Sequence, residues 1–309
     1  MKIMITGACG HIGSYIFENI HKAKKVKNVS LIDNLSSKRY SSLFNIKKNK
    51  KIKFDFFNID LSKKNSLKNF KKYDVVIHCA SYTNAEDSFS IKKEMFRNNL
   101  NCMKNIIKYC KKNKSNLIHL SSTSVYGKKA KIVAENDKHL LKPQSPYAEI
   151  KIKEENLLNQ NKKNLSYISF RLGTITGVSK GIRFHTAVNK FCLSAATNGY
   201  ITIYKTAYNQ YRPYLSLRDA FKIFLFCIEK KVFNNQIYNA LSGNFTVKQI
   251  LSKIKKNKKK IKIKFINSPI MNKLSYFVDT SKIKNLGLRL NSNIEYDIKQ
   301  TLNLFKTIR

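Results

Sequence analysis

Three glycines at regular spacing follow the first apolar segment of the chain. Residues 3–5 have the pattern of a short strand, and Gly7, Gly10 and Gly13 lead directly into an amphipathic segment. A strand that runs through glycines into a helix leaves backbone N–H groups at the positive end of a helix dipole, where a phosphate or pyrophosphate binds. The segment therefore predicts nucleotide binding, although a flexible turn is the simpler alternative.

A carboxylate at the end of the second predicted strand narrows the choice of nucleotide. Val29–Ile32 is followed by Asp33, at the offset of about twenty residues where an acid holds both ribose hydroxyls of NAD. The same carboxylate repels the additional phosphate of NADP. NAD is therefore the expected cofactor. The nearby basic residues Lys38 and Arg39 leave NADP as an alternative.

Length and cysteine usage favour a large protein of a reducing compartment. The 309 residues suffice for a substantial core, and no apolar run approaches the ~20 residues that cross a bilayer. Because the first strand begins at residue 2, we expect no signal peptide. The six cysteines form no C-x-x-C, so we expect reduced thiols, a cytoplasmic location and no metal site.

The net charge of +42 raises the possibility of nucleic-acid binding. The lysines, however, are spread over nearly all segments outside the predicted strands, and no zinc finger, RNP-like motif or helix-turn-helix is present. A generally basic, solvated surface therefore explains the charge better. Such a surface still attracts anionic ligands, among them nucleotide sugars.

Strand patterns alternate with helical patterns along the chain, which predicts βαβ units and a doubly wound parallel sheet. The segment 73–80 is apolar on both faces, as in a central strand. No linker separates the two halves. We therefore expect residues 1–173 to form a nucleotide-binding domain, with additions from about 212–240, and residues 174–309 to form mainly a second, interleaved lobe.

Hydroxyl groups gather where the chemistry of such a fold takes place. The strand pattern 117–120 ends in Ser121–Gly127, and the carboxyl ends of parallel strands face the ligand. Further along, Tyr147 and Lys151 are four residues apart and share one face of a helix. A free tyrosine, with a pKa of ~10, is a poor base, but a neighbouring ammonium and a positive nicotinamide ring would lower that pKa.

These motifs together identify a family. TGACGHIG, Asp33, SSTSVYG and SPYAEIK occur in this order, and RPYLSLRD and YFVDTSKI follow. The chain resembles the extended short-chain dehydrogenase/reductases of the NAD-dependent epimerase/dehydratase family, and is most similar to UDP-galactose 4-epimerases. The resemblance implies an α/β fold, with a Rossmann-type doubly wound parallel sheet and a smaller interleaved C-terminal substrate-binding lobe.

The resemblance also implies roles for individual residues. The catalytic residues would be Ser122, Tyr147 and Lys151. The cofactor would be bound by Gly7, Gly10, His11, Ile12, Gly13, Asp33, Asn34, Asp60, Leu61, Ala80, Ser81, Asn99, Tyr147 and Lys151. The substrate would be bound by Ser122, Thr123, Tyr147, Thr174, Arg183, Asn189 and Arg212. Arg183, Asn189 and Arg212 are the candidates for its diphosphate. The segment 211–219 itself carries two arginines, Arg212 and Arg218, that could form bidentate contacts with a diphosphate, with structural or solvated arginines as the alternative.

Departures from the family pattern select among its activities. Thr123 and Ser124 stand where dehydratases carry Asp-Glu, so dehydratase and decarboxylase activities are disfavoured, and Thr174 replaces an asparagine of many epimerases. We expect an NAD-dependent epimerase of a nucleotide-activated hexose with a transient 4-keto intermediate. The alternatives are a nucleotide-sugar 4-ketoreductase and, outside enzymes, a nucleotide-binding scaffold or a nucleic-acid binder. By analogy we expect a homodimer through helices at 90–112 and 147–159.

Overall fold

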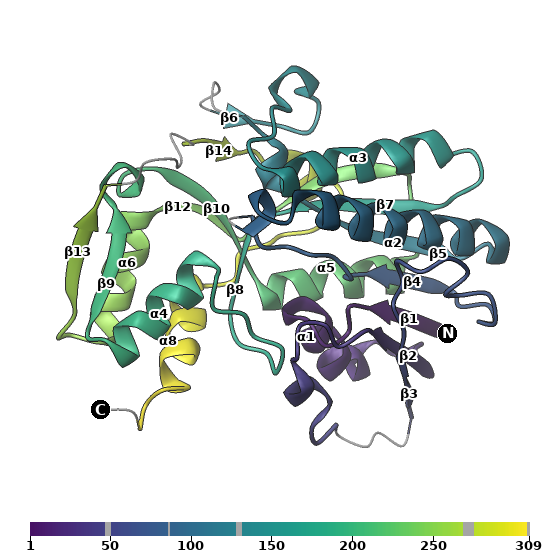
Figure 1. Cartoon of the computed structure of the whole chain (residues 1–309), viewed down its shortest axis with the longest axis horizontal. Helices are drawn as coiled ribbons and strands as arrows, with labels where there is room; N and C mark the ends of the chain where they lie inside the picture. Colours follow the sequence, from purple (N-terminus) through teal and green to yellow (C-terminus); the bar gives the residue numbers. More distant parts are fainter. Residues whose placement is uncertain (47–50, 86, 128–131, 268–274, 308–309) are drawn as a thin grey trace.

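A large parallel sheet organises the computed structural model, which describes residues 1–46, 51–85, 87–127, 132–267 and 275–307. In this part of the chain the sheet has seven strands in the order β11-β7-β5-β4-β1-β2-β3 (Figure 1). The strands are β1 (Lys2–Thr6), β2 (Asn28–Asp33), β3 (Lys53–Asn58), β4 (Val75–His78), β5 (Asn116–Ser122), β7 (Tyr167–Leu172) and β11 (Gln236–Ala240). The expected doubly wound fold is confirmed.

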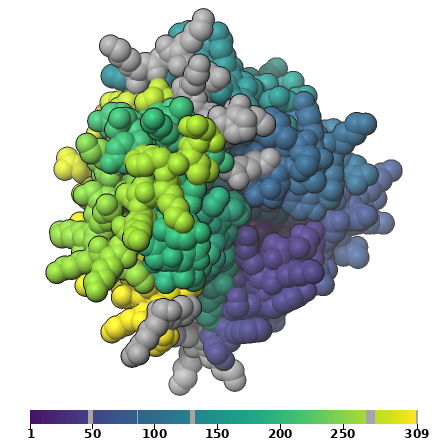
Figure 2. All heavy atoms as spheres, turned by 60° about the vertical axis from the view of Figure 1, so that its left-hand side comes forward, coloured from purple at the N-terminus to yellow at the C-terminus, as the bar shows by residue number. Residues whose placement is uncertain are grey.

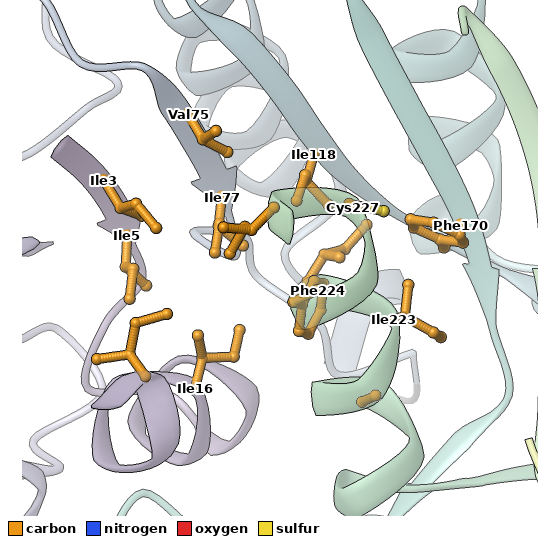
Figure 3. Packing of buried hydrophobic residues seen from close by; sticks show 14 of the residues in the cluster. Ile3, Ile5, Ile16, Val75, Ile77, Ile118, Phe170, Ile223, Phe224 and Cys227 are labelled. Atoms are coloured by element: carbon orange, nitrogen blue, oxygen red, sulfur yellow. The ribbon is translucent and has the colours of Figure 1, made fainter. Parts of the chain in front are cut away.

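Helices cover both faces of this sheet. One face packs on α1 (His11–Asn19) and α5 (Leu217–Lys230), and Figure 3 shows Ile16 and Phe224 of these helices meeting Ile5 and Ile77 of the strands. The other face packs on α2 (Lys92–Asn113) and α3 (Pro146–Asn161) through a separate buried cluster. Because both faces are covered, the central strand β4 is buried along its whole length, as its sequence predicts.

Smaller sheets and helices build a second lobe beside the carboxyl ends of the large sheet (Figure 1). Its own buried cluster includes Val188, Ile250 and Ile298. The strands of the smaller sheets are β8 (Thr174–Thr176), β10 (Tyr211–Ser216), β12 (Gly243–Thr246), β9 (Tyr200–Tyr204), β13 (Lys262–Ile266), β6 (Ile132–Val133) and β14 (Phe277–Val278). The remaining helices are α4 (Ala187–Thr197), α6 (Val247–Asn257), α7 (Ser281–Asn285) and α8 (Ile294–Asn303).

The chain passes repeatedly between the two lobes. After β10 in the second lobe, α5 and β11 return to the large sheet, where β11 pairs with β7. Within the described residues, no helix is both long and apolar enough to cross a bilayer. Those residues hold no cluster of three or more His, Cys, Asp or Glu side chains suited to a metal ion, and all six cysteines are free thiols.

Candidate active site

Two adjoining cavities lie at the carboxyl ends of the large sheet, between the lobes. Their volumes are about 430 and 400 Å³, and Gly7, Gly10 and Cys79 line both of them. Figure 2 shows the hollow between the purple and blue N-terminal part and the green C-terminal part of the surface. A ligand that spans both cavities would therefore pass over the glycine-rich turn.

The glycine-rich turn is shaped by close backbone contacts. Gly7 has φ +62°, and a Cβ there would lie 2.6 Å from the Ala80 backbone nitrogen. A Cβ at Gly13 would lie 2.9 Å from the Ala8 Cα. Gly10 precedes α1, and a Cβ there would meet the Gly7 carbonyl oxygen at 3.1 Å and otherwise stand in the cavity. The turn therefore leaves room for a pyrophosphate against the positive end of α1.

The first cavity presents the carboxylate predicted for the ribose. The backbone N–H groups of Cys9 and Leu35 donate to Asp33 over 2.9 and 2.8 Å, which fixes its orientation. Most of the other predicted cofactor residues also line this cavity, namely Asn34, Asp60, Leu61, Ala80 and Ser81. His11, Ile12 and Gly13 line the second cavity instead. The arrangement fits an extended dinucleotide.

The three predicted catalytic residues line the second cavity together. Ser145 begins α3 by accepting a hydrogen bond from the Ala148 N–H at 3.2 Å, and the helix then presents Tyr147 and Lys151. The Lys151 Nζ lies 5.7 Å from the centre of the Tyr147 ring. Ser122, from the end of β5, lines the same cavity. The structure thus brings a phenol, an ammonium and a hydroxyl to one place.

Lys151 forms an ion pair with a buried carboxylate, Glu154, that was not among the predicted site residues. Its Nζ lies 2.8 Å from Glu154 Oε2, which is also 3.0 Å from His119 Nε2. Burial alone would lower the pKa of the Lys151 ammonium, but Glu154 outweighs it and holds the pKa above its ordinary value. Burial opposes ionisation of Glu154, yet Lys151 and His119 lower the pKa of Glu154 to about 2. Both groups are therefore charged at neutral pH.

Four of the predicted substrate residues complete the second cavity, Thr123, Thr174, Arg183 and Arg212. The Arg183 Nη1 donates to Thr83 Oγ1 at 2.6 Å, and the Arg212 Nη2 donates to Gln210 Oε1 at 2.9 Å. Burial lowers the pKa of both guanidinium groups. Two arginines therefore reach the cavity from different segments of the second lobe.

Other predicted residues lie outside both cavities. Asn189 is fully buried and donates to the Arg183 carbonyl oxygen at 3.1 Å, and Asn99 holds the backbone of Tyr82 through its side-chain amide. Arg218 lines neither cavity, and its Nη2 lies 3.3 Å from Asp297 Oδ1. Asn189 and Asn99 are buried because the packing of the elements, which motif spacing does not report, decides the direction of their side chains.

Further residues line the cavities without having been predicted. Thr83 and His185 line both, and Thr186 and Tyr276 line the second. Tyr276 belongs to the YFVDTSKI motif, so this motif could have identified it as a site residue. The other three lie in loops or at the start of α4, where no sequence pattern marks them.

Comparison with known proteins agrees with this geometry. The sequence profile described as "NAD dependent epimerase/dehydratase family" matches residues 3–240. A dTDP-D-glucose 4,6-dehydratase of Dictyostelium discoideum is 30% identical over 77% of this chain and 57% of its own length. The chain spans about half the length of the curated relatives it matches first.

Solved structures share the fold over the whole chain. A UDP-N-acetylglucosamine 4-epimerase of Methanobrevibacter ruminantium, in complex with UDP-N-acetylmuramic acid, has 24% identity and a TM-score of 0.85 over 99% of this chain and 98% of its own. A UDP-glucose 4-epimerase of Thermus thermophilus in complex with NAD has 21% identity and a TM-score of 0.81 over 99% of each chain. With a family profile matching most of its length, this chain belongs to the NAD-dependent epimerase/dehydratase family.

Proposed function

We propose that the protein is an NAD-dependent epimerase of a nucleotide-activated hexose that acts through a transient 4-keto sugar. The observation that supports this most is that Ser122, Tyr147 and Lys151 line one cavity, which continues over the glycine-rich turn. In that arrangement a sugar hydroxyl can meet a base while its carbon faces the nicotinamide end of a bound dinucleotide.

The family's cofactor, NAD, fits the two cavities. When bound, NAD supplies the acceptor, and later the donor, of the hydride. Asp33 would hold the adenosine ribose, and the turn from Gly7 to Gly13 would hold the pyrophosphate. Lys151 would hold the second ribose through an N–H group that its contact with Glu154 leaves available, since an ammonium has three donors.

The protein's own groups move the proton of the reaction. Tyr147 would take the proton from the sugar 4-hydroxyl as the C4–H bond breaks, and would return it when hydride re-enters from the opposite face. Ser122 would donate a hydrogen bond to the same sugar oxygen. The Ser122 Oγ already accepts from the Ser124 hydroxyl at 2.9 Å, which leaves its own proton free for that role.

Elimination of water is disfavoured by the same cavity. Thr123 and Ser124 supply hydroxyls where an acid would be needed. Two carboxylates on α3, Glu154 and Glu155, are held in buried ion pairs with Lys151 and Arg171. Neither is placed to serve as a general acid.

The activity can be tested without adding cofactor. The purified protein is incubated with UDP-, GDP-, CDP- and dTDP-hexoses, and the products are read by NMR. We expect interconversion of 4-epimers by endogenous NAD, and a loss of kcat of at least about 100-fold in Tyr147→Phe with NAD still bound. Steady consumption of NADH by a 4-keto sugar would instead identify a ketoreductase, and undiminished turnover in Tyr147→Phe would remove the proposed base.

The proposal also covers the domains of the protein, its assembly and its location. Residues 1–173, with α5 and β11, would bind NAD, and residues 174–309 would mainly bind the nucleotide sugar. A homodimer through α2 and α3 would place the exposed sides of these helices together. The free thiols support a reducing, cytoplasmic setting.

A further inference from the structure

A chain of four buried polar side chains ends at the second cavity. Ser169 Oγ lies 2.8 Å from His119 Nδ1, and His119 Nε2 lies 3.0 Å from Glu154 Oε2. The same carboxylate oxygen accepts a hydrogen bond from Lys151 Nζ at 2.8 Å. All four side chains are buried, and of the four only Lys151 lines either cavity. The other three therefore reach the site through Lys151.

The direction of the hydrogen bonds to Glu154 follows from its charge. Burial opposes ionisation of Glu154, but Lys151 and His119 lower the pKa of Glu154 to about 2, so the carboxylate can only accept. His119 Nε2 must then carry a proton and donate to Glu154. His119 on β5 lies opposite Ser169 on β7 in the sheet register, which places the Ser169 hydroxyl at Nδ1. Two neighbouring strands thus fix the imidazole ring, and the ring fixes Glu154.

Glu154 supplies the negative charge that the buried ammonium of Lys151 needs. It is the only carboxylate within 4 Å of Lys151 in the described part of the chain. Burial by itself lowers the pKa of Lys151, and the net rise above the ordinary value comes chiefly from Glu154. Without this carboxylate, burial would dominate.

The other titratable groups around the pair offer no replacement for Glu154. They are His78 at the end of β4, Cys79 directly after it and Cys102 on α2, besides Tyr147 on the same helix as Lys151. Burial lowers the pKa of His78 to about 3 and raises the pKa of both thiols to about 12, so all three are uncharged at neutral pH. Removal of the Glu154 charge would therefore leave Lys151 without a fixed negative partner.

Resting on the proposed function, we propose that Glu154 and His119 are positioning residues of the epimerase, which keep Lys151 charged and in place beside Tyr147. The Lys151 Nζ lies 5.7 Å from the centre of the Tyr147 ring. A positive charge there stabilises the phenol oxygen whenever its proton has left, as the exchange of a proton with the sugar requires. The reaction should therefore slow at the pH at which Lys151 loses its proton.

The charge of Lys151 can be measured without turnover. Only an uncharged amine reacts with acetic anhydride, so trace acetylation of the purified protein, followed by peptide mass spectrometry, reports the pH at which Lys151 loses its proton. In Glu154→Gln, an isosteric change, Lys151 labelling should level off at least about one pH unit lower than in the unmodified protein, because burial is no longer opposed. Labelling of the exposed Lys153 on the same helix should keep its pH profile.

Turnover supplies the second measurement. The kcat is determined from pH 6 to 10 with the nucleotide hexose that is epimerised fastest. Between pH 7 and 9, kcat of Glu154→Gln should fall at least about tenfold more than kcat of the unmodified protein, because Lys151 loses its charge in this range. His119→Leu should change both profiles in the same direction by less, and carries the test if Glu154→Gln does not fold. His119→Gln, whose amide can donate to Glu154, should restore them.

Glu155→Gln is the matched control. It removes the adjacent buried carboxylate of α3, which pairs with Arg171 at 2.7 Å instead of Lys151. Its Lys151 labelling should level off where that of the unmodified protein does. An unchanged Lys151 profile in Glu154→Gln, the same change in Glu155→Gln, or a kcat lowered by one factor at every pH would overturn the inference and leave the epimerase proposal standing. If no sugar is epimerised, the proposed function fails, while the labelling still decides whether Glu154 keeps Lys151 charged.

Discussion

Buried ionisable side chains follow two different rules in this protein. Lys151 and Glu154 keep their charges because they form an ion pair 2.8 Å long, with His119 as a third partner. His78 has no such partner, and its Nδ1 instead shares a hydrogen bond of 2.7 Å with Thr6 Oγ1. Burial lowers the pKa of His78 to about 3, so the folded protein holds its ring neutral.

This neutral histidine predicts a loss of stability in mild acid. Below the ordinary histidine pKa of 6.5 the unfolded chain takes up a proton that folded His78 does not, until the pH reaches about 3. The free energy of unfolding should therefore fall with decreasing pH, by up to about 1.4 kcal/mol per pH unit for this group. Urea denaturation at pH 7, 6 and 5 measures the slope.

His78→Gln supplies the comparison, because the amide cannot take up the proton. Its slope below pH 6.5 should be smaller by about the same 1.4 kcal/mol per pH unit. Parallel slopes in the two proteins would show that His78 is protonated in the folded state too. His11, whose pKa is likewise lowered to about 3 by burial, retains its contribution in both proteins.

At the scale of elements, one loop joins the second lobe to the glycine-rich turn. Gly181 packs so closely that a Cβ there would lie 2.6 Å from the Gly10 carbonyl oxygen. The Ser14 hydroxyl donates to Ser179 Oγ at 3.0 Å and accepts from the Gly181 N–H at 3.0 Å. The loop between β8 and α4 therefore packs directly against the turn that would hold the pyrophosphate.

Replacement of Gly181 tests this contact. In Gly181→Ala the new methyl group must push the loop away from the turn, because the carbonyl oxygens that it would collide with, those of Cys9 and Gly10, belong to the backbone. We expect purified Gly181→Ala to retain at least about tenfold less NAD than the unmodified protein, measured as bound nucleotide per chain. Ser179→Ala removes hydrogen bonds from the same contact without adding an atom, so its loss should be smaller. Full NAD content in Gly181→Ala would contradict the role given to the loop.

Sequence patterns predict the parts of this site that depend on local geometry. The spacing of Tyr147 and Lys151 puts both on one side of α3, and a parallel sheet brings Ser122 to the same edge, so their meeting follows from the motifs alone. Glu154 contacts both Lys151 and His119, and the motifs do not predict this because it depends on how α3 packs against β5. The place of Arg218 outside both cavities depends on packing in the same way, since its partner Asp297 comes from the last helix.

The charge of the whole molecule bears on its assembly. The chain carries a net charge of +42, and the exposed side of α2 includes Lys104, Lys108 and Lys111. Lys153 and Asn156 are exposed on the adjoining α3. A dimer that pairs these helices brings two basic surfaces together, so repulsion opposes it at low ionic strength.

Salt should therefore promote self-association, if it occurs through these helices. We expect the dimer fraction in sedimentation velocity to rise between 50 and about 500 mM NaCl, because the Debye length falls from roughly 14 Å to 4 Å. Lys108→Glu should form the dimer at lower salt than the unmodified protein. Dissociation on adding salt would point to a different interface.

The loop that packs against the glycine-rich turn also has a consequence for metabolism. A dinucleotide held on a turn that this loop supports would exchange slowly with the surrounding pool, and in the proposed epimerisation each cycle would return it to its starting oxidation state. Throughput would then follow sugar supply and stay insensitive to the NAD⁺/NADH ratio outside. An organism could run this isomerisation equally well in respiring and fermenting cells.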